Sequence, residues 1–168
     1  MYGIDLVLPD VRYLADKKQY IRGLVFTHGH DDHIGGIAYL YPKLGRIPMW
    51  ATKLAAAFTN IKLEEAKLKT RVTPVDFNQI LRIGPFTVSF VRMTHSVPDT
   101  ANLIIETPVG VFYHGSDFKF DFDGRFGINV IQRKTGVRLL VPFTHDFSAK
   151  VQKWERRPPF FLVLAPDG

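Results

Sequence analysis

Three histidines and two aspartates lie within six residues of this chain, in the segment Thr27-His28-Gly29-His30-Asp31-Asp32-His33. Imidazole and carboxylate are ligands that zinc and similar divalent metals accept. In an extended loop, side chains two positions apart point the same way, so His28 and His30 can bind one metal together. Asp32 and His33 follow where the chain is expected to turn into a helix, and they can face a second cation. The segment therefore predicts a metal-binding loop.

Two further candidate ligands follow later apolar segments of the chain. His95 comes after residues 86–94, and Asp117 comes shortly after residues 111–114. Each would be weak evidence alone, because a single histidine after a strand more often has a structural role. Together with the upstream loop, they complete a three-histidine site and supply a carboxylate that can bridge two metals. His114, within the second apolar segment, is interpreted as a structural strand residue.

The elements that position these residues follow from hydropathy and from turn residues. Strands are expected at residues 23–27, 47–51, 71–77, 79–83, 86–94, 102–107, 111–114, 137–143 and 160–165, and helices at 33–41, 52–69 and 144–154. Pro42 should end the first helix and Thr52 can cap the N-terminus of the second. Strands mixed with helices, with the polar clusters at strand ends, predict a layered α/β domain.

Composition limits the classes of protein to which the chain can belong. A length of 168 residues suits one hydrophobic core, and 46% hydrophobic with 23% charged residues is typical of a globular domain. The absence of cysteine excludes disulfides, thiolate metal sites and a thiol nucleophile. No apolar run approaches the roughly 20 residues that span a bilayer, and the first residues do not resemble a signal peptide. We therefore expect a cytoplasmic protein without a membrane partner.

The net charge of +6 is concentrated in the last quarter of the chain. Residues 125–168 hold eight Lys and Arg residues against three Asp and Glu, whereas residues 1–124 are nearly neutral. A basic segment can bind the phosphate backbone of nucleic acid. A solvated basic surface is the more ordinary interpretation, so charge alone permits nucleic acid without proving it.

The order of the motifs resembles the metallo-β-lactamase superfamily. Four segments are similar to ribonuclease J, a family within it: residues 3–10 (GIDLVLPD), 23–30 (GLVFTHGH), 92–99 (RMTHSVPD) and 117–121 (DFKFD). The resemblance covers residues 3–123 and implies an α/β fold, the αββα sandwich of that superfamily, here without its N-terminal strands and without the inserted β-CASP domain. Residues 124–168 are an unmatched basic segment that we expect to pack on the same domain.

The resemblance also implies a role for each candidate residue. It assigns the first metal to His28, His30 and His95, the second metal to Asp32 and His33, and the bridging position to Asp117. Asp31 would lie beside the metals or handle protons, so the candidate catalytic carboxylates are Asp31, Asp32 and Asp117. Two zinc ions are expected, with manganese as an alternative. The implied reaction is hydrolysis of RNA phosphodiesters by a metal-activated hydroxide.

Several alternatives stay open at this point. In the family, another histidine beyond the insertion binds the second metal; His145 could replace it, or could be an ordinary surface histidine. The function could then be that of a ribonuclease, of a β-lactam-hydrolysing or promiscuous hydrolase of the same fold, or of an inactive metal- or RNA-binding remnant. Missing strands and 14 phenylalanines also suggest a homo-oligomer as one way of covering exposed apolar surface.

Overall fold

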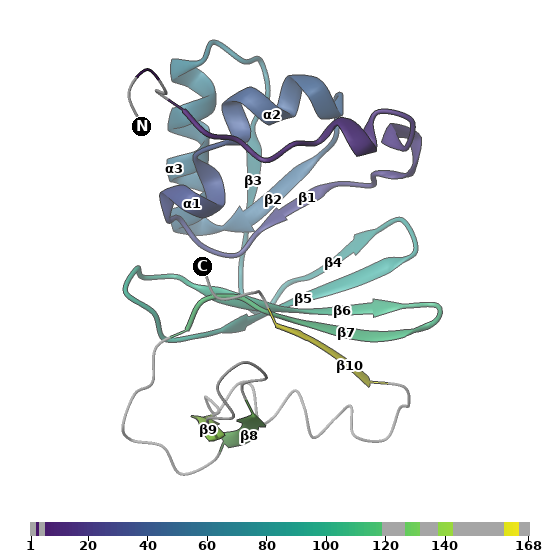
Figure 1. Ribbon diagram of the computed structural model, residues 1–168, viewed down its shortest axis with the longest axis vertical. Coiled ribbons are helices and arrows are strands. Elements are labelled where there is room, and N and C mark those ends of the chain that lie inside the picture. The colour runs from purple at the N-terminus through teal and green to yellow at the C-terminus, as the bar shows by residue number, and fades with distance from the viewer. Residues whose placement is uncertain (1–2, 4–5, 119–126, 132–137, 143–159, 165–168) are drawn as a thin grey trace. The chain divides into compact units, whose positions relative to one another are not determined.

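A computed structural model describes residues 3, 6–118, 127–131, 138–142 and 160–164 (Figure 1). Backbone contacts divide the chain into two compact units, Met1–Val75 and Asp76–Gly168. The first unit combines a parallel sheet with helices, and the second contains a larger, mainly antiparallel sheet. Among the described residues, no helix is long and apolar enough to cross a membrane.

The first unit is a three-stranded sheet covered by helices. Its elements are η1 (Arg12–Leu14), η2 (Lys18–Tyr20), β1 (Leu24–Phe26), α1 (Asp31–Ile34), α2 (Ile37–Leu44), β2 (Met49–Thr52), α3 (Lys53–Glu65) and β3 (Val72–Val75). The strand order is β1-β2-β3 and both pairings are parallel. In Figure 1, α2 and α3 lie on the same face of this sheet. Parallel strands need such a cover, because both of their faces must be shielded from water.

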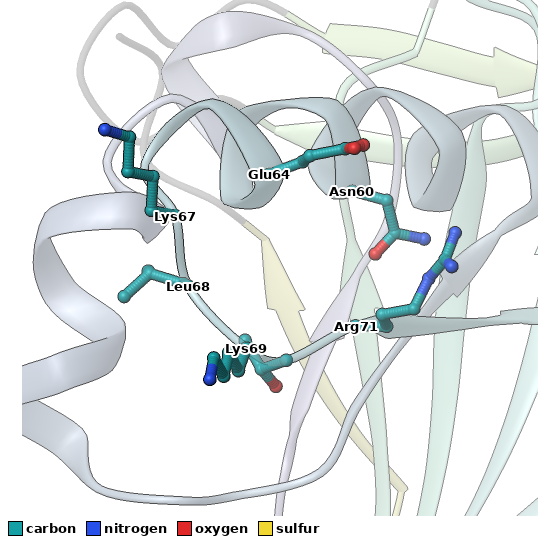
Figure 2. A pocket seen from close by; sticks show the side chains of 7 residues that line it. Asn60, Glu64, Lys67, Leu68, Lys69 and Arg71 are labelled. Atoms are coloured by element: carbon teal, nitrogen blue, oxygen red, sulfur yellow. The ribbon is translucent and has the colours of Figure 1, made fainter.

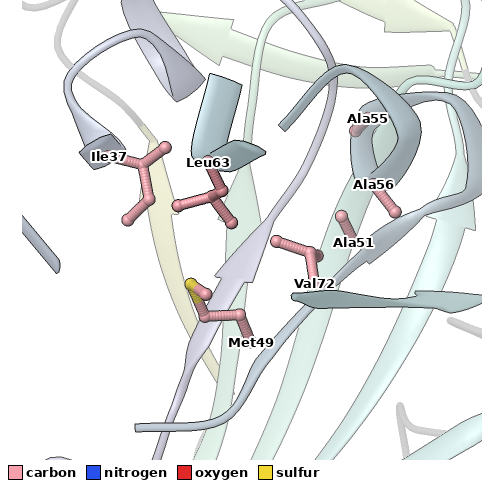
Figure 3. Packing of buried hydrophobic residues seen from close by; sticks show 7 residues of the cluster. All are labelled: Ile37, Met49, Ala51, Ala55, Ala56, Leu63 and Val72. Carbon is pink, nitrogen blue, oxygen red and sulfur yellow. The ribbon is translucent and has the colours of Figure 1, made fainter. Parts of the chain in front are cut away.

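The core of the first unit lies between this sheet and its helices. Figure 3 shows the seven buried residues that form it: Ile37, Met49, Ala51, Ala55, Ala56, Leu63 and Val72. Leu63 of α3 is completely buried, as is Ala51 of β2. Three alanines in this set let α3 approach the sheet closely, so the larger side chains of Leu63 and Met49 fill the remaining space.

The second unit is built on a five-stranded sheet. Its strands are β4 (Ile80–Ile83), β5 (Phe86–Arg92), β6 (Ala101–Thr107), β7 (Gly110–Gly115) and β10 (Phe160–Leu164), in the order β10-β7-β6-β5-β4. The pairs β4–β5, β5–β6 and β6–β7 are antiparallel, whereas β10 pairs with β7 in parallel. A separate antiparallel pair joins β8 (Gly127–Ile131) and β9 (Arg138–Pro142). For the remainder of residues 124–168, packing on the same domain stays a prediction.

Most expected elements are present, and the main error concerns the first helix. The helix expected over residues 33–41 is divided into α1 and α2, with Gly35 and Gly36 between them. Pro42 lies inside α2 instead of ending it. The end comes at Gly45, whose φ of 98° places it in the left-handed region and whose N–H bonds to the carbonyl of Tyr41.

The second predicted helix, expected over residues 52–69, is present but shorter than expected. Thr52 does occupy the N-cap of α3, but its side chain makes no capping hydrogen bond. That helix ends at Glu65, four residues before the expected end. The helix expected over residues 144–154 lies outside the described residues. Strand β8 was not anticipated, because the hydropathy pattern weakens after Asp123.

Candidate metal centre

The histidine-rich loop begins directly after β1 in the first unit. Thr27 and His28 are buried, and His28 is completely inaccessible to solvent. The hydroxyl oxygen of Thr27 lies 3.1 Å from Nδ1 of His28 and orients that imidazole ring. Metal coordination by His28 would therefore involve Nε2, since the other ring nitrogen is engaged in the protein.

The three imidazoles of the loop lie against one another. The ring centroids of His28 and His30 are 4.9 Å apart in an edge-to-face arrangement, and those of His28 and His33 are 4.0 Å apart. The coordinating atoms of His28 and His30 lie within 4.8 Å of each other. Two imidazole nitrogens that bind one ion at a Zn–N distance of about 2 Å are about 3–4 Å apart, so small side-chain rotations would bring this pair to a coordinating geometry. The donor set and spacing in this unit thus fit a divalent metal.

The short helix α1 presents the two aspartates and His33. Asp31 and Asp32 occupy its first turn, where a carboxylate interacts favourably with the helix dipole. The carboxylate of Asp32 lies 3.7 Å from Nε2 of His33, so these two side chains can face one cation. Asp31 instead forms an ion pair with Lys62 of α3, whose Nζ lies 2.6 Å from Oδ1 of Asp31. That contact ties α1 to α3, and the catalytic role expected for Asp31 stays a prediction.

Glycine is required where α1 ends. A Cβ atom on Gly35 would lie 2.5 Å from the backbone oxygen of Asp31 and 3.2 Å from its carboxylate, so the backbone of α1 would have to move. We expect Gly35→Ala to weaken metal binding about 10–100-fold, as loss of an orienting contact typically does. A zinc titration against a chelator measures this affinity.

Gly36→Ala is the matched control for that variant. A Cβ atom there would meet only the ends of the Leu40 and Leu8 side chains, at 3.3 and 3.4 Å, and both can rotate away. Its zinc affinity should therefore remain near that of the wild type. Equal losses in the two variants would contradict the positioning role of α1.

The second unit contributes a histidine and an aspartate. Nε2 of His95 lies 3.5 Å from Oδ2 of Asp117, and both side chains are partly exposed. His95 belongs to the connection between β5 and β6, which is closed by hydrogen bonds from Met93 N to Thr100 O and from Thr100 Oγ1 to Val97 O. His95 and Asp117 therefore form a second pair of adjacent side chains of the types that can bind a metal.

A buried amide supports the segment that carries Asp117. The side-chain oxygen of Asn102 on β6 accepts a hydrogen bond from Ser116 N at 2.9 Å, directly before Asp117. The amide nitrogen of Asn102 donates to the hydroxyl of Tyr113 on β7. Asn102 is 1% exposed, so these bonds are shielded from water and hold the end of β7 beside β6.

This network predicts a change in stability at alkaline pH. Burial raises the pKa of Tyr113 to about 12, while the Asn102 hydrogen bond opposes the shift. The folded state thus retains a proton that the unfolded state releases near pH 10, so the free energy of unfolding falls between pH 10 and 12. Two pKa units correspond to at most about 3 kcal/mol.

Tyr113→Phe should remove this component of the pH dependence. At neutral pH the variant should be less stable by about 1–3 kcal/mol, because the amide nitrogen of Asn102 loses its acceptor. Urea unfolding at pH 8 and at pH 11 should show the deficit shrinking as pH rises. Tyr20→Phe, at a position 68% exposed, serves as control, and a pH-independent deficit in Tyr113→Phe would contradict the prediction.

Each unit thus brings together part of the expected set. The first unit gathers His28, His30, Asp32 and His33, and the second unit pairs His95 with Asp117. His114 lies within β7, as a strand residue, and His145 lies outside the described residues. Sequence reasoning missed Lys62, which forms an ion pair with Asp31, and Asn102, which supports the backbone before Asp117, because neither carries a motif of its own.

Comparison with known proteins identifies the family of the chain. The family model of the beta-lactamase superfamily domain matches residues 4–141. Ribonuclease J of Synechocystis is 43% identical over 132 residues, covering 75% of this chain and 21% of the relative. Ribonuclease J of Thermus thermophilus is 39% identical over 131 residues, covering 72% and 22%. A solved metallo-β-lactamase fold protein from Bacillus subtilis is 20% identical, with a TM-score of 0.47, over 60% of this chain and 42% of that one.

The family match includes every candidate ligand in both units, from His28 to Asp117. The resemblance to ribonuclease J is confirmed, and so is the expected α/β fold. The chain spans about a fifth of the length of the ribonuclease J relatives that it matches. By its match over residues 4–141, the chain belongs to the beta-lactamase superfamily and has the metallo-β-lactamase fold.

Proposed function

We propose that this chain is the metal-dependent part of a ribonuclease that hydrolyses RNA phosphodiesters, at a cytoplasmic location. The observation that carries the proposal is the cluster of three imidazoles after β1, in a chain 33–43% identical to curated ribonucleases J. The relatives are named as ribonucleases, so RNA is the substrate class that they suggest. No other identified group in the described residues offers comparable chemistry.

The proposed ligand set combines the two units. His28 and His30 would bind the first metal with His95, Asp32 and His33 would bind the second, and Asp117 would bridge both. The separate clusters in the two units support this assignment, since each already places its own donors close together. Zinc suits a set of imidazoles and carboxylates, and manganese is the alternative.

The protein side of the reaction follows from the contacts of these residues. Bound divalent ions would supply Lewis acidity, lowering the pKa of water and neutralising charge on the phosphoryl group. Thr27 holds the ring of His28 in one orientation, while Lys62 holds Asp31 and with it the first turn of α1. Asn102 fixes the backbone before Asp117. These contacts keep the ligands in place before substrate arrives, which limits reorganisation during the reaction.

Metal content and hydrolysis should be measured on the same preparations. We expect about two metal ions per chain by elemental analysis, RNA cleavage by the wild type, and loss of both metal and cleavage in Asp117→Ala. Hydrolysis of a β-lactam is assayed in parallel, because the chain belongs to the beta-lactamase superfamily. Turnover of the β-lactam without RNA cleavage would replace the proposed substrate, and absence of metal and of both activities would refute the hydrolase.

A further inference from the structure

A second site lies at the other end of α3, in the hollow formed where that helix meets β3. The hollow has a volume of about 510 Å³ and is lined by Asn60, Glu64, Lys67, Leu68, Lys69, Thr70 and Arg71 (Figure 2). Three of these seven side chains are cationic and one is anionic. None of them belongs to the proposed metal-binding set, so the hollow needs its own explanation.

The wall of the hollow is held by hydrogen bonds that do not involve the cations. Asn60 of α3 binds both backbone groups of Val72, accepting from its N–H at 2.7 Å and donating to its carbonyl at 3.1 Å. The hydroxyl of Thr70 donates to the phenolic oxygen of Tyr41 at 3.0 Å. Backbone bonds from Lys67 N to Glu64 O and from Leu68 N to Leu63 O close the end of α3. The segment is therefore a fixed frame for its exposed side chains.

The three cations are exposed and available to a ligand. Lys67, Lys69 and Arg71 alternate with less exposed residues along the segment. In the part of the chain that the structure describes, none of the three forms an ion pair, whereas Lys62 on the same helix binds Asp31. Figure 2 shows Arg71 extending beside Asn60, with Lys67 and Lys69 on the other side of the hollow. Unpaired cations around a polar hollow favour an anion, and phosphate accepts hydrogen bonds from both Lys and Arg.

We propose that this hollow binds backbone phosphates of an RNA chain whose cleaved bond lies at the metal centre; the inference rests on the proposed function. The N-terminal half of α3 contacts the histidine loop, since a Cβ atom on Gly29 would meet Phe58 at 2.7 Å. From Phe58 to Glu65 the helix advances about 10 Å, at about 1.5 Å per residue. A helical strand, which rises about 3.4 Å per nucleotide, covers that distance in about three nucleotides, and an extended single strand needs fewer, so the hollow takes phosphates a few nucleotides away from the loop.

The test compares two triple variants that remove the same charges from the same unit. One is Lys67→Gln/Lys69→Gln/Arg71→Gln, and the control is Lys17→Gln/Lys18→Gln/Arg22→Gln, at positions that are also exposed. Binding of a labelled single-stranded RNA of about ten nucleotides is followed by fluorescence anisotropy across a salt series, with a length chosen to span loop and hollow. A chelator is present during binding, so that the readout does not depend on hydrolysis.

The expected result is weaker binding with a weaker salt dependence in the first variant only. The plot of log K against log salt has a negative slope, and each lost phosphate contact makes it shallower by about 0.7, so the loss of three contacts changes it by about 2. The affinity near 0.1 M salt should then fall roughly 10–100-fold. Lys67→Arg/Lys69→Arg/Arg71→Lys keeps the charges and should bind as the wild type does, which separates charge loss from misfolding.

Three outcomes would overturn the inference. The first is an equal effect of the two charge-removing variants, which would mean that total charge alone matters. The second is loss of binding in the charge-retaining variant. The third is erasure of the difference by millimolar inorganic phosphate at constant ionic strength, which would indicate a site for the free anion. A protein that binds RNA through the hollow but never cleaves it when loaded with metal would refute the proposed function, and of this inference only the binding of RNA phosphates in the hollow would remain.

Discussion

The variants His28→Ala and His95→Ala should each lower RNA hydrolysis about a thousandfold, and the double variant should lose little more. A bound metal contributes several kcal/mol of transition-state stabilisation, and about 1.4 kcal/mol corresponds to a factor of ten in rate. If both histidines bind the same ion, either substitution removes that ion's contribution. The second substitution then has nothing further to remove, as in other catalytic groups that act as a unit.

The double variant matters because the two histidines belong to different units of the chain. His28 follows β1 in the first unit, and His95 follows β5 in the second. Independent sites would give additive free energies, so the double variant would fall by about a millionfold. Strong non-additivity in kcat/KM would therefore demonstrate one shared centre, which is the central assumption of the proposed function.

His114→Ala is the matched control for this cycle. His114 lies within β7, three residues before Asp117, so it tests whether any histidine near the candidate centre has the same effect. We expect its kcat/KM to stay within about tenfold of the wild type, the lower end of the range for residues around a metal site. Additive losses for His28 and His95, or a thousandfold loss in His114→Ala, would contradict the assignment.

The candidate ligands could be found in the sequence because their positions are local. His28, His30, Asp32 and His33 lie within six residues, so the end of one strand and one turn of helix are enough to group them. Lys62 and Asn102 could not be found in that way. Lys62 reaches Asp31 only because α3 packs beside α1, and Asn102 supports Asp117 only because β6 pairs with β7.

The limits of prediction for the fold have a similar physical origin. Short apolar segments bounded by glycine or proline predicted β4 to β7, since a hairpin's strands are neighbours along the chain. The parallel pairing of β10 with β7 joins segments about fifty residues apart, and no local pattern specifies such a partner. The division between α1 and α2 depends on the close approach of Gly35 to the carbonyl of Asp31, which apolar spacing does not encode.

Leu63→Ala should have the largest effect on stability among single substitutions in the first unit. Leu63 is completely buried at the centre of the cluster in Figure 3, where it packs with Ile37, Met49 and Val72. Removing a buried leucine side chain costs about 2–5 kcal/mol, because the loss of burial is compounded by a cavity that neighbours fill only in part. At about 2–4 °C per kcal/mol for a chain of this size, Tm should fall by roughly 5–20 °C.

Ile61→Ala separates this cavity effect from any change in α3 itself. Ile61 lies two residues before Leu63 on the same helix, is 53% exposed, and loses a comparable volume when replaced. Its stability should remain within about 0.5 kcal/mol of the wild type, as is usual for surface positions. Because Leu63 packs where α3 meets the sheet, its loss should also loosen the anchor that Lys62 provides for Asp31. Zinc affinity should therefore decrease in Leu63→Ala and not in Ile61→Ala, and equal behaviour of the two variants in thermal unfolding would contradict the assigned core.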